Sequence, residues 1–388
     1  MRILMILENA FPPDVRVEKE IKSLINAGHE IVLVCSSPAS KDEVKDWNDA
    51  TIIRKRMSRF IYKSSVGCLR FPFYFNYWRK YLKHVFKQYK FDAIHLHDLP
   101  LSKVAKEFSI KYQIPFVLDL HENWPAAMRI ALHTNTPLGK ILSSNTLWQN
   151  YEQKYVSQSD KVVTVVEEMK ERISQYELDD KSIFVVPNTI NIADSTFEER
   201  TSKNNRPTLF YAGGINVHRG LQIVLRSLIV VKRKIPKILL NIVGTGSYEI
   251  VLKNYVKKNK LDDNVVFWGW KSYDEMLEIL KVSDIAMIPH LLSEQTDNSS
   301  PNKLFQYAYM KKPIISSDCK SLKRVILEMQ AGIIYPDRDF IELSRGIIKL
   351  AENEKLRVKL GESGYQAIMG KYNWQLSSSE LLRLYKEL

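Results

Sequence analysis

Short runs of apolar residues alternate with longer, mixed segments along the chain. Residues 1–7 (MRILMIL) and 29–35 (HEIVLVC) are almost uniformly apolar. Between them, residues 17–28 place apolar side chains at helical spacing, and Gly28 stands where such a helix would end. Uniformly apolar runs are typical of parallel strands that are buried on both faces. Strands of this kind separated by helices predict a doubly wound α/β sheet.

The alternation continues through the first half of the chain, pauses and starts again. Further strand-like runs occur at residues 91–98, 114–122, 160–166 and 182–190. Residues 191–207 are polar and lack periodicity, and the pattern then resumes. We therefore predict two Rossmann-like domains, residues 1–190 and 208–370, joined by a linker at 191–207. Two such domains in series leave a cleft, and ligands of these folds bind beyond the carboxyl ends of the strands.

Polar residues and glycines gather where the predicted strands end. In the first domain they are Asp14, Arg16, His95, His97, Asp98, Asp119, His121, Glu122 and Asn188, and in the second they are Gly213, Gly214, Arg219, Gly244, Gly246 and His290. A single polar strand end is usually structural. Because the carboxyl ends of parallel strands share one edge of a sheet, this many polar ends favour an active site there.

The stretch SPNK at residues 300–303 opens a further predicted helix. A helix N-terminus carries unpaired N–H groups and a partial positive charge, so it attracts anions. Pro301 fits the first turn, where its missing N–H costs nothing, and Lys303 adds a full positive charge. An ordinary helix cap explains the same residues, so the stretch alone leaves both interpretations open.

Two glycine loops, at residues 211–220 (YAGGINVHRG) and 243–246 (VGTG), each follow a predicted strand. Glycine lets the backbone approach a ligand closely, and Arg219 can bridge phosphate oxygens. With SPNK, these loops predict a diphosphate site on the second domain. The chain carries no dinucleotide-binding fingerprint and no P-loop, which disfavours a dinucleotide oxidoreductase and P-loop chemistry. It also shows no nucleophile elbow and no metal-ligand spacing, so we predict no bound metal.

The net charge of +13 is concentrated in one segment. Residues 51–90 contain eleven Lys or Arg, no Asp or Glu, and many interleaved aromatic residues. Basic and aromatic residues together suit an anionic membrane surface. They also suit nucleic acid, but no nucleic-acid-binding motif occurs elsewhere in the chain. A solvated basic face over an aromatic core is the remaining alternative.

Composition places the chain among ordinary globular proteins. Its 388 residues, with 45% hydrophobic and 26% charged residues, suffice for two or three domains with sizeable cores. The three cysteines lie far apart, which is typical of a reduced, cytoplasmic protein. The apolar start reads as a buried strand, not a signal peptide, and no apolar run is long enough to span a bilayer. We predict a cytoplasmic protein that associates peripherally with the inner face of the cell membrane.

In their order and spacing, several stretches resemble the retaining nucleotide-sugar glycosyltransferases of the GT-B fold, called group 1 or family 4. These stretches are AGHEIVLV, VVPNTI, YAGGINVHRGL, NIVGTG, NVVFWGW and SPNKLFQYAYMKKPII. The resemblance covers nearly the whole chain. It implies two Rossmann-like domains that face a cleft, with the acceptor on residues 1–190 and the nucleotide sugar on 208–370. It also implies a last helix, within 371–388, that packs back on the first domain.

Some positions depart from the family's pattern. The two acidic residues that the family carries fall here on Asn298 and Gln306, and a second basic residue of the glycine loop falls on Gly214. Gln306 can still accept one hydrogen bond and donate another, without the added strength of a charge. Arg219 alone keeps that side of the phosphate clamp, and we expect Lys303 to supply the missing charge.

The resemblance implies a role for each site residue. Arg219 and Lys303 would stabilise the departing diphosphate, and His121 would hydrogen-bond the donor sugar, unless it is an ordinary strand-end histidine. The implied donor-binding set is Gly213, Gly214, Gly244, Gly246, Trp270, Asn298, Pro301, Asn302, Leu304 and Gln306, and the acceptor-side set is Asp14, Arg16, His97 and Glu122. Protein cations would then take the place of a metal, and no cofactor is expected.

The implied activity is transfer of a hexosyl group from a nucleotide-diphosphate sugar, with a UDP-sugar favoured, to a glycan or lipid-linked acceptor with retention. Such a transferase would build cell-surface polysaccharide or glycoconjugate at an anionic membrane surface, without nucleic acid. Two alternatives stay open: a nucleotide-sugar epimerase of the same fold, and a non-catalytic nucleotide-sugar-binding subunit. Acceptor-dependent release of nucleoside diphosphate would distinguish the transferase from both.

Overall fold

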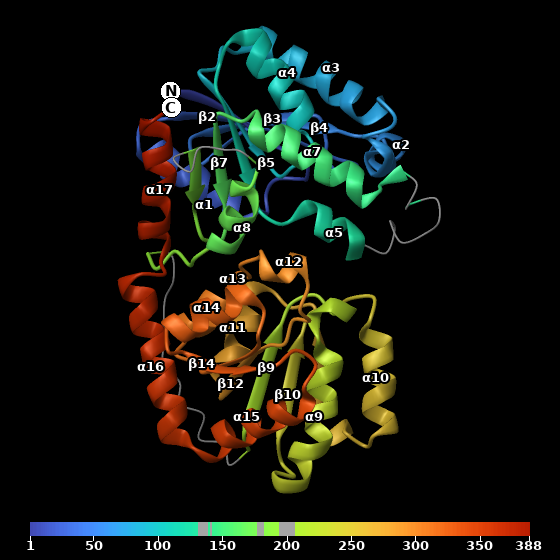
Figure 1. The fold of residues 1–388 in the computed structure, drawn as a ribbon, viewed down its shortest axis with the longest axis vertical. Coiled ribbons are helices and arrows are strands. Elements are labelled where there is room, and N and C mark those ends of the chain that lie inside the picture. Colours follow the sequence, from blue (N-terminus) through green and yellow to red (C-terminus); the bar gives the residue numbers. More distant parts are fainter. Residues whose placement is uncertain (131–138, 140–141, 177–181, 194–205) are drawn as a thin grey trace. The chain divides into compact units, whose positions relative to one another are not determined.

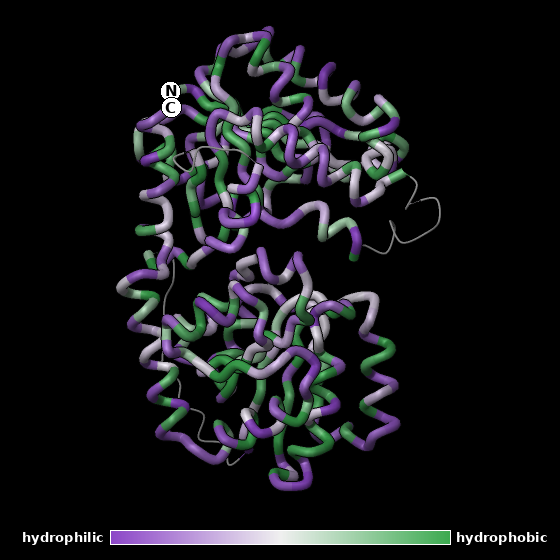
Figure 2. The backbone as a smooth tube through the Cα atoms, in the orientation of Figure 1, coloured by the Kyte–Doolittle hydropathy of each residue, from purple (hydrophilic) through white to green (hydrophobic). Residues whose placement is uncertain are grey.

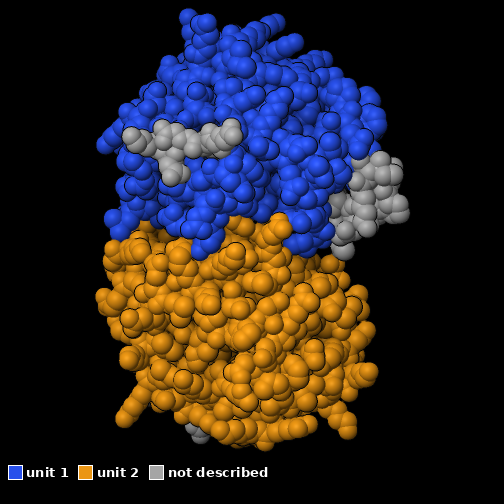
Figure 3. All heavy atoms as spheres, in the orientation of Figure 1, with its two compact units in different colours: residues 1–188, 375–388 blue, residues 189–374 orange. Residues whose placement is uncertain are grey.

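A computed structural model describes residues 1–130, 139, 142–176, 182–193 and 206–388. These residues form two compact units, one of residues 1–188 with 375–388 and one of residues 189–374 (Figure 3). Most of the linker predicted at 191–207 lies outside the described residues. Apolar stretches gather in the sheets of both units (Figure 2), as expected for strands that are covered on both faces.

The first unit is built on a sheet whose strands follow the spatial order β3-β4-β2-β1-β5-β6-β7-β8 (Figure 1). Its strands are β1 (Arg2–Leu7), β2 (Glu30–Ser37), β3 (Glu43–Trp47), β4 (Ala50–Arg56), β5 (Ala93–His97), β6 (Phe116–Leu120), β7 (Lys161–Thr164) and β8 (Ile183–Val185). Neighbouring strands run parallel except β3, which pairs antiparallel with β4 at the edge. The chain crosses from one side of β1 to the other between β2 and β5, so the switch point lies between β1 and β5.

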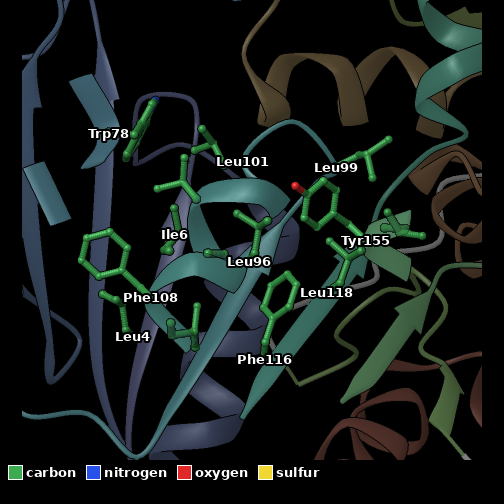
Figure 4. Packing of buried hydrophobic residues seen from close by; sticks show 14 of the residues in the cluster. Leu4, Ile6, Trp78, Leu96, Leu99, Leu101, Phe108, Phe116, Leu118 and Tyr155 are labelled. Carbon is green, nitrogen blue, oxygen red and sulfur yellow. The ribbon is translucent and has the colours of Figure 1, made fainter. Parts of the chain in front are cut away.

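Helices and an aromatic-rich core complete the first unit. The helices are α1 (Val15–Asn26), α2 (Arg59–Ser64), α3 (Phe73–Gln88), α4 (Ser102–Tyr112), α5 (Trp124–Ile130), α7 (Asn145–Ser157), α8 (Glu167–Ser174) and α17 (Trp374–Lys386), with a short 3₁₀ turn, η1, at Ser65–Gly67. Leu4 of β1 and Leu96 of β5 belong to one buried cluster with Trp78 of α3 and Phe108 of α4 (Figure 4). Burying each such side chain contributes about 1.5–3 kcal/mol, which stabilises the packing of α3 and α4 against these two strands.

The second unit has a parallel sheet with the order β11-β10-β9-β12-β13-β14. Its strands are β9 (Thr208–Ala212), β10 (Leu239–Val243), β11 (Val265–Gly269), β12 (Ile285–Ile288), β13 (Ile314–Ser317) and β14 (Gly332–Tyr335). The helices are α9 (Leu221–Lys234), α10 (Glu249–Lys258), α11 (Tyr273–Lys281), α12 (Glu294–Asp297), α13 (Asn302–Tyr309), α14 (Lys320–Glu328), α15 (Phe340–Glu352) and α16 (Glu354–Gly370), with 3₁₀ turns η3 (Val217–Arg219) and η4 (Asp262–Asn264). Its switch point lies between β9 and β12.

Alternate residues of β9 enter different buried clusters. Leu209 and Tyr211 pack with α9 and α15, whereas Phe210 packs with α11, α13 and α14. Side chains of a strand alternate between the two faces, so helices cover both faces of this sheet. The two doubly wound α/β units predicted from the sequence are therefore confirmed. The antiparallel strand β3 is the departure, because residues 43–56 form a short hairpin that the apolar pattern did not reveal.

Two further features bear on function. The last helix, α17, packs with the first unit, and its residues Leu381, Leu384 and Tyr385 are buried there. Among the helices that the structure describes, none combines the length and the apolar character that crossing a bilayer requires.

Candidate functional site

In the second unit, two glycine loops meet backbone to backbone beside the switch point. The amide of Gly213 donates to the carbonyl oxygen of Val243 at 2.9 Å. A Cβ atom on Gly244 would lie 2.1 Å from the carbonyl oxygen of Gly213, and one on Gly246 would lie 2.2 Å from that of Ile215. Real Cβ atoms do not come this close to backbone, so only glycine permits the two loops to touch. The loops predicted to approach a ligand are thus fixed side by side at the ends of β9 and β10.

Lys303, at the start of α13, reaches back into this loop region. Its Nζ atom lies 4.4 Å from the centre of the Tyr211 ring, within range of a cation–π interaction. The same Nζ atom lies 2.7 Å from the place where a Cβ atom of Gly213 would stand. Gly213, whose φ angle is +137°, therefore leaves the space that the ammonium group fills. Lys303 and the first glycine loop, which are distant in sequence, form one site.

Arg219 brings a second cation to this site. Its Nη1 atom donates to Nε2 of His290, which lies just beyond β12, at 3.1 Å. His290 is 1% exposed, and burial together with Lys303 and Arg219 lowers its pKa well below the usual value. His290 is therefore a neutral acceptor that holds Arg219 in place. Burial and Arg219 also lower the pKa of Lys303 far below its usual value, while burial, Arg219 and Lys303 lower that of His218 to about 4.

These lowered pKa values share the same two causes. Each group is partly removed from water, and each feels a neighbouring positive charge. Within the part of the chain that the structure describes, no carboxylate forms an ion pair with Arg219 or Lys303. Cations held together without a counter-charge are costly unless an anion binds. Such an arrangement is suited to an anion.

The start of α13 differs slightly from the sequence prediction. Pro301 is the N-cap residue of α13, with φ −71° and ψ 126°, so it precedes the first turn instead of lying in it. Asn302 is the first helical residue, and its Oδ1 atom is buried without a hydrogen-bond partner. Leu304 is 1% exposed and packs in the core, so only its backbone could face a ligand. Gln306 is half-buried on the same helix.

Two other predicted donor-side residues have different surroundings. Asn298 is buried and follows α12, where its Nδ2 atom donates to the carbonyl oxygen of Glu294 at 2.6 Å. This bond engages part of its side-chain amide in capping α12. Trp270 is 75% exposed. The residue before it, Gly269, accepts a hydrogen bond from the Gly244 amide at 2.7 Å, so the backbone leading into Trp270 runs beside the second glycine loop.

The first unit carries a buried ion network at the carboxyl end of its sheet. Arg16, on α1, is 3% exposed and lies 2.9 Å from Oε1 of Glu20, one helical turn on. Its Nη2 atom donates to Oδ1 of Asp119 on β6 at 3.0 Å, and Nη1 donates to the carbonyl oxygen of Val186 at 2.9 Å. Although burial alone would raise the pKa of Asp119, Arg16 and His121 lower it well below its usual value. Asp119 is therefore an anion, and its hydrogen bonds with Arg16 hold it in place.

His121 stands at the end of β6 between two carboxylates. Its Nε2 atom lies 3.0 Å from Oδ2 of Asp119, and its Nδ1 atom lies 3.6 Å from Oδ2 of Asp98. Asp98 follows β5 and also accepts the backbone amide of His121, at 3.3 Å. Burial opposes the charged imidazole, but Asp98 and Asp119 outweigh it and raise the pKa of His121 to about 9. At neutral pH this histidine is an imidazolium, with its side chain 18% exposed.

Two further histidines line the floor of this cluster. His95 and His97, on β5, are fully buried, and burial lowers the pKa of both, that of His97 to about 3. Potential ligand atoms of His95, His97, Glu20 and Asp119 all lie within 4.8 Å of one another, a donor set that suits a metal. Arg16, however, already contacts both carboxylates, so its guanidinium supplies the positive charge that a metal would bring. We therefore assign this cluster no metal.

The acceptor-side residues predicted from the sequence divide into two kinds. Arg16 and His97 are buried in the network, where they contact protein groups. Asp14 caps α1, because its Oδ1 atom accepts the amides of Arg16 and Val17, both at 3.1 Å. Glu122 is half-buried and directly follows His121. The structure brings His97 and His121 together, with their Nδ1 and Nε2 atoms 3.3 Å apart.

The candidate set derived from the sequence lacked Glu20, Asp98, Asp119 and Tyr385. Glu20 could have been found from its spacing, because it lies four residues after Arg16 on a predicted helix. Asp98 and Asp119 were visible as polar strand ends, but their opposed contacts with His121 depend on strand register. Tyr385 could not be found in this way, because it comes from the last helix.

With this geometry in place, comparison with known proteins gives a consistent result. The family described as Glycosyltransferase Family 4 matches residues 15–194, and Glycosyl transferases group 1 matches residues 193–367. An uncharacterised glycosyltransferase of Methanocaldococcus jannaschii is 26% identical over 236 residues, which are 59% of this chain and 59% of that protein. A phosphatidyl-myo-inositol mannosyltransferase of Mycolicibacterium smegmatis is 21% identical, covering 100% of this chain and 94% of that protein.

Solved structures share the fold. A sucrose-phosphate synthase of Thermosynechococcus elongatus superposes with a TM-score of 0.79 at 14% identity, covering 100% of this chain and 98% of that one. WaaG, a glycosyltransferase involved in lipopolysaccharide biosynthesis, gives a TM-score of 0.71 at 14% identity and 98% coverage of both chains. At such identities the likeness shows the fold alone, and that fold is GT-B.

Proposed function

The chain belongs to the group 1 glycosyltransferases of the GT-B fold, and we propose that it transfers a hexosyl group from a nucleotide-diphosphate sugar, favouring a UDP-sugar, to a glycan or lipid-linked acceptor with retention. The observation that carries this proposal is the cation pair of the second unit. Arg219 and Lys303 flank two touching glycine loops and have no acidic partner among the described residues. A site of this kind is suited to a diphosphate leaving group.

The donor's diphosphate would lie against the loops at the ends of β9 and β10. There, Arg219, Lys303 and the amides opening α13 neutralise the charge that grows as the sugar–phosphate bond breaks. His290 would keep Arg219 aimed at the phosphates without adding charge. Positive charge supplied in this way stabilises the leaving group without a metal, so we propose metal-independent transfer. The exposed indole of Trp270 would stack on the nucleotide base.

In the first unit, we propose that the imidazolium of His121 hydrogen-bonds a hydroxyl of the donor sugar. Asp119 would orient the ring, and the half-buried carboxylate of Asp98 would accept a hydrogen bond from a sugar hydroxyl. Arg16 and His97 would act on the acceptor side only through these groups, because they are buried. In front-face retention, the departing phosphate would itself accept the acceptor's proton, which requires no carboxylate nucleophile.

Ligand-induced stabilisation tests the donor site without knowledge of the acceptor. A nucleotide sugar present at a hundred times its dissociation constant should stabilise the protein by about 2.7 kcal/mol. We expect UDP-sugars to raise the melting temperature of the wild type, and Arg219→Met and Lys303→Met to lose that response. Arg226→Met is a matched control, because Arg226, on α9, lies over the ring of Phe340 at the start of α15 instead of at the loops. If both site variants respond like the wild type, the diphosphate assignment is wrong.

The two alternative activities give different products. A nucleotide-sugar epimerase would convert the donor to its epimer with no acceptor present, and a binding subunit would release no nucleoside diphosphate. The engagement of Asn298 in capping α12, in place of an acidic residue, keeps the binding subunit in view. Acceptor-dependent release of nucleoside diphosphate would establish the transferase.

We also propose that the first unit docks on an anionic membrane, where a lipid-linked acceptor would be found. The structure separates the aromatic residues of the basic segment into two groups. Tyr74, Phe75 and Trp78 are buried in the core. Phe60, Tyr62, Phe71 and Phe73 are 47–66% exposed, and we call them the aromatic patch. The rings of Phe60 and Phe73 lie 5.8 Å apart, and those of Phe71 and Phe73 lie 6.3 Å apart.

Basic residues around the aromatic patch fit a negatively charged surface. Arg59 and Lys63 lie on α2, which buries none of its residues, and Arg70 precedes α3. Each Lys or Arg near such a surface contributes about 1 kcal/mol of attraction. Arg54 is a poor probe by comparison, because it pairs with Glu43 and donates to the carbonyl oxygen of Phe11.

Co-sedimentation with vesicles tests this docking. We expect binding to phosphatidylserine-containing vesicles, little binding to phosphatidylcholine alone, and loss of binding in added salt. The combined variant Arg59→Ser, Lys63→Ser and Arg70→Ser should bind less while keeping its thermal response to nucleotide. Replacing Lys257, Lys258 and Lys260 of the second unit with Ser removes the same charge as a control. Equal binding to both lipids, or equal loss in both variants, would contradict the proposal.

A further inference from the structure

The last helix contacts the buried network of the first unit through one hydroxyl group. Tyr385, on α17, is 4% exposed, and its hydroxyl oxygen lies 2.8 Å from Nδ1 of His95 on β5. The two rings are nearly parallel, at an angle of 15°, with their centres 6.1 Å apart. This contact joins residues that are 290 positions apart in the sequence. No step of the proposed reaction uses either residue.

The other ring nitrogen of His95 faces two carboxyl groups. Nε2 lies 3.6 Å from Oε2 of Glu20 and 3.6 Å from Oδ2 of Asp119. That Asp119 oxygen is the one that contacts His121, at 3.0 Å. Tyr385 is therefore linked to His121 through two intervening side chains, all within the first unit.

The direction of the hydrogen bond decides which His95 nitrogen carries the proton. Among the described residues, the Tyr385 hydroxyl has His95 as its one hydrogen-bond partner. If Tyr385 accepted a proton from Nδ1, its own O–H would be buried without a partner and would carry the full desolvation penalty of that group. The bare Nε2 atom would then also point its lone pair at the anionic oxygen of Asp119. When Tyr385 donates, its O–H has a partner, and Nε2–H faces the oxygens of Asp119 and Glu20 at 3.6 Å, a favourable charge–dipole contact that is longer than a hydrogen bond.

We propose that Tyr385 is a positioning residue, which fixes the tautomer of His95 so that Nε2–H faces Asp119 and holds its carboxylate against His121. The last helix would thereby help to set the charge and orientation of the histidine at the strand end. This inference rests on the proposed role of His121 only for its effect on catalysis. The tautomer and its influence on His121 are properties of the protein without ligand.

Nitrogen-15 NMR of the full chain labelled at histidine tests the proposal directly. The protein has eight histidines, and single His→Gln variants would assign the signals. In the wild type, we expect His95 to show an unprotonated Nδ1 and a protonated Nε2. Tyr385→Phe removes only the hydroxyl and should give a mixture of tautomers. Without an Nε2–H fixed toward Asp119, the acid dissociation constant of His121 should change by about two- to tenfold.

The titration of His121 must be read against all the groups that face it. These are Arg16 and Glu20 of α1, His95 and His97 of β5, Asp98 beyond β5 and Asp119 of β6. Tyr372→Phe is the control, because the Tyr372 hydroxyl bonds to Glu328 in the second unit. It should leave the His95 and His121 signals unchanged.

A second variant separates the tautomer from general packing. In His95→Asn, Oδ1 can take the place of Nδ1 and accept from Tyr385, but the shorter side chain has no N–H at the position of Nε2, so His121 should titrate as it does in Tyr385→Phe. The proposal would be wrong if His95 of the wild type were protonated at Nδ1. It would also be wrong if the pKa of His121 were unchanged in either variant. If His121 shifts but turnover of donor stays unchanged, the positioning stands, and the role proposed for His121 in catalysis is wrong.

Discussion

Replacing Arg16 with Met should destabilise the first unit far more than the loss of an ordinary ion pair would. Arg16 is 3% exposed and contacts two carboxylates, Glu20 at 2.9 Å and Asp119 at 3.0 Å. Arg2 offers a matched control, because it pairs with Glu30 at 2.7 Å in the same unit but remains exposed. Met fills most of the volume of Arg in both places, so the comparison isolates the buried charge.

The size of the expected loss of stability depends on whether Glu20 and Asp119 can become neutral once Arg16 is replaced. At about 3 Å and an effective dielectric constant of about 20, each contact is worth roughly 5 kcal/mol before desolvation is subtracted. Breaking a buried pair from one side costs about 3–5 kcal/mol. Burial and Asp119 already raise the pKa of Glu20 to about 8, so Glu20 can be neutral at pH 7 and adds little to the loss. Asp119 stays charged, and we expect a loss of about 3 kcal/mol, against about 0–1 kcal/mol for Arg2→Met.

Hydrogen exchange measured by mass spectrometry can resolve the two units, which a single melting curve cannot. About 3 kcal/mol corresponds to roughly 100-fold faster exchange of β5 and β6 amides that open globally, with the second unit unchanged. Because the pKa of Asp119 is lowered, its contribution to stability exists above about pH 4 and is lost as the pH falls. The difference in exchange rate between Arg16→Met and the wild type should therefore become smaller at acid pH. If Arg16→Met exchanges no faster than Arg2→Met, the network does not stabilise the unit as argued.

Further predictions concern the second unit. UDP binding should take up protons, because a diphosphate would raise the lowered pKa of Lys303. Calorimetry near pH 8 in HEPES and Tris buffers, which carry no phosphate, would show this uptake, and equal heats would contradict it. Gly213→Ala should weaken UDP binding by displacing the Lys303 ammonium, 2.7 Å from the new Cβ, whereas Gly28→Ala, at φ +85° with open space, should not. Turnover should survive excess EDTA, and a loss restored by magnesium or manganese would refute metal independence. Lys303→Met should raise the melting temperature of the ligand-free protein while abolishing its response to UDP-sugar.

The alternation of apolar runs was enough to predict both sheets, because a strand covered on both faces must be apolar along its length. It missed the antiparallel strand β3, and with it the hairpin of β3 and β4, and the burial of β3 shows why. Glu43–Trp47 is an edge strand with mostly exposed side chains, so its sequence carries little periodic signal. Residues 51–90 illustrate the same limit, since composition could not tell the exposed Phe73 from its buried neighbour Tyr74.

For the site, local motifs located the loops but not the partners. Gly213, Arg219 and Lys303 were each recognisable, yet the contact of Lys303 with Tyr211 depends on where α13 begins relative to β9. Arg16 was predicted to face the acceptor, and its burial beneath Asp119 depends on the packing of α1 against β6. Tyr385 shows the limit most clearly, because its partner His95 lies 290 positions away in the sequence.

The two clusters follow opposite electrostatic arrangements, and this accounts for their different expected responses. In the first unit, each buried charge has a counter-charge: Asp119 has Arg16 and His121, so removing a member leaves an uncompensated ion. In the second unit, burial and the repulsion by Arg219 both lower the pKa of Lys303. The charged form of Lys303 lowers the stability of the fold at neutral pH, so replacing Lys303 should raise that stability. An anion that binds beside Lys303 neutralises its charge, and this contributes to the free energy of binding. We therefore expect substitutions in the first network to destabilise the protein, because its residues hold one another in place. Substitution of Lys303 should stabilise the protein, because the cluster of the second unit is suited to binding an anionic ligand.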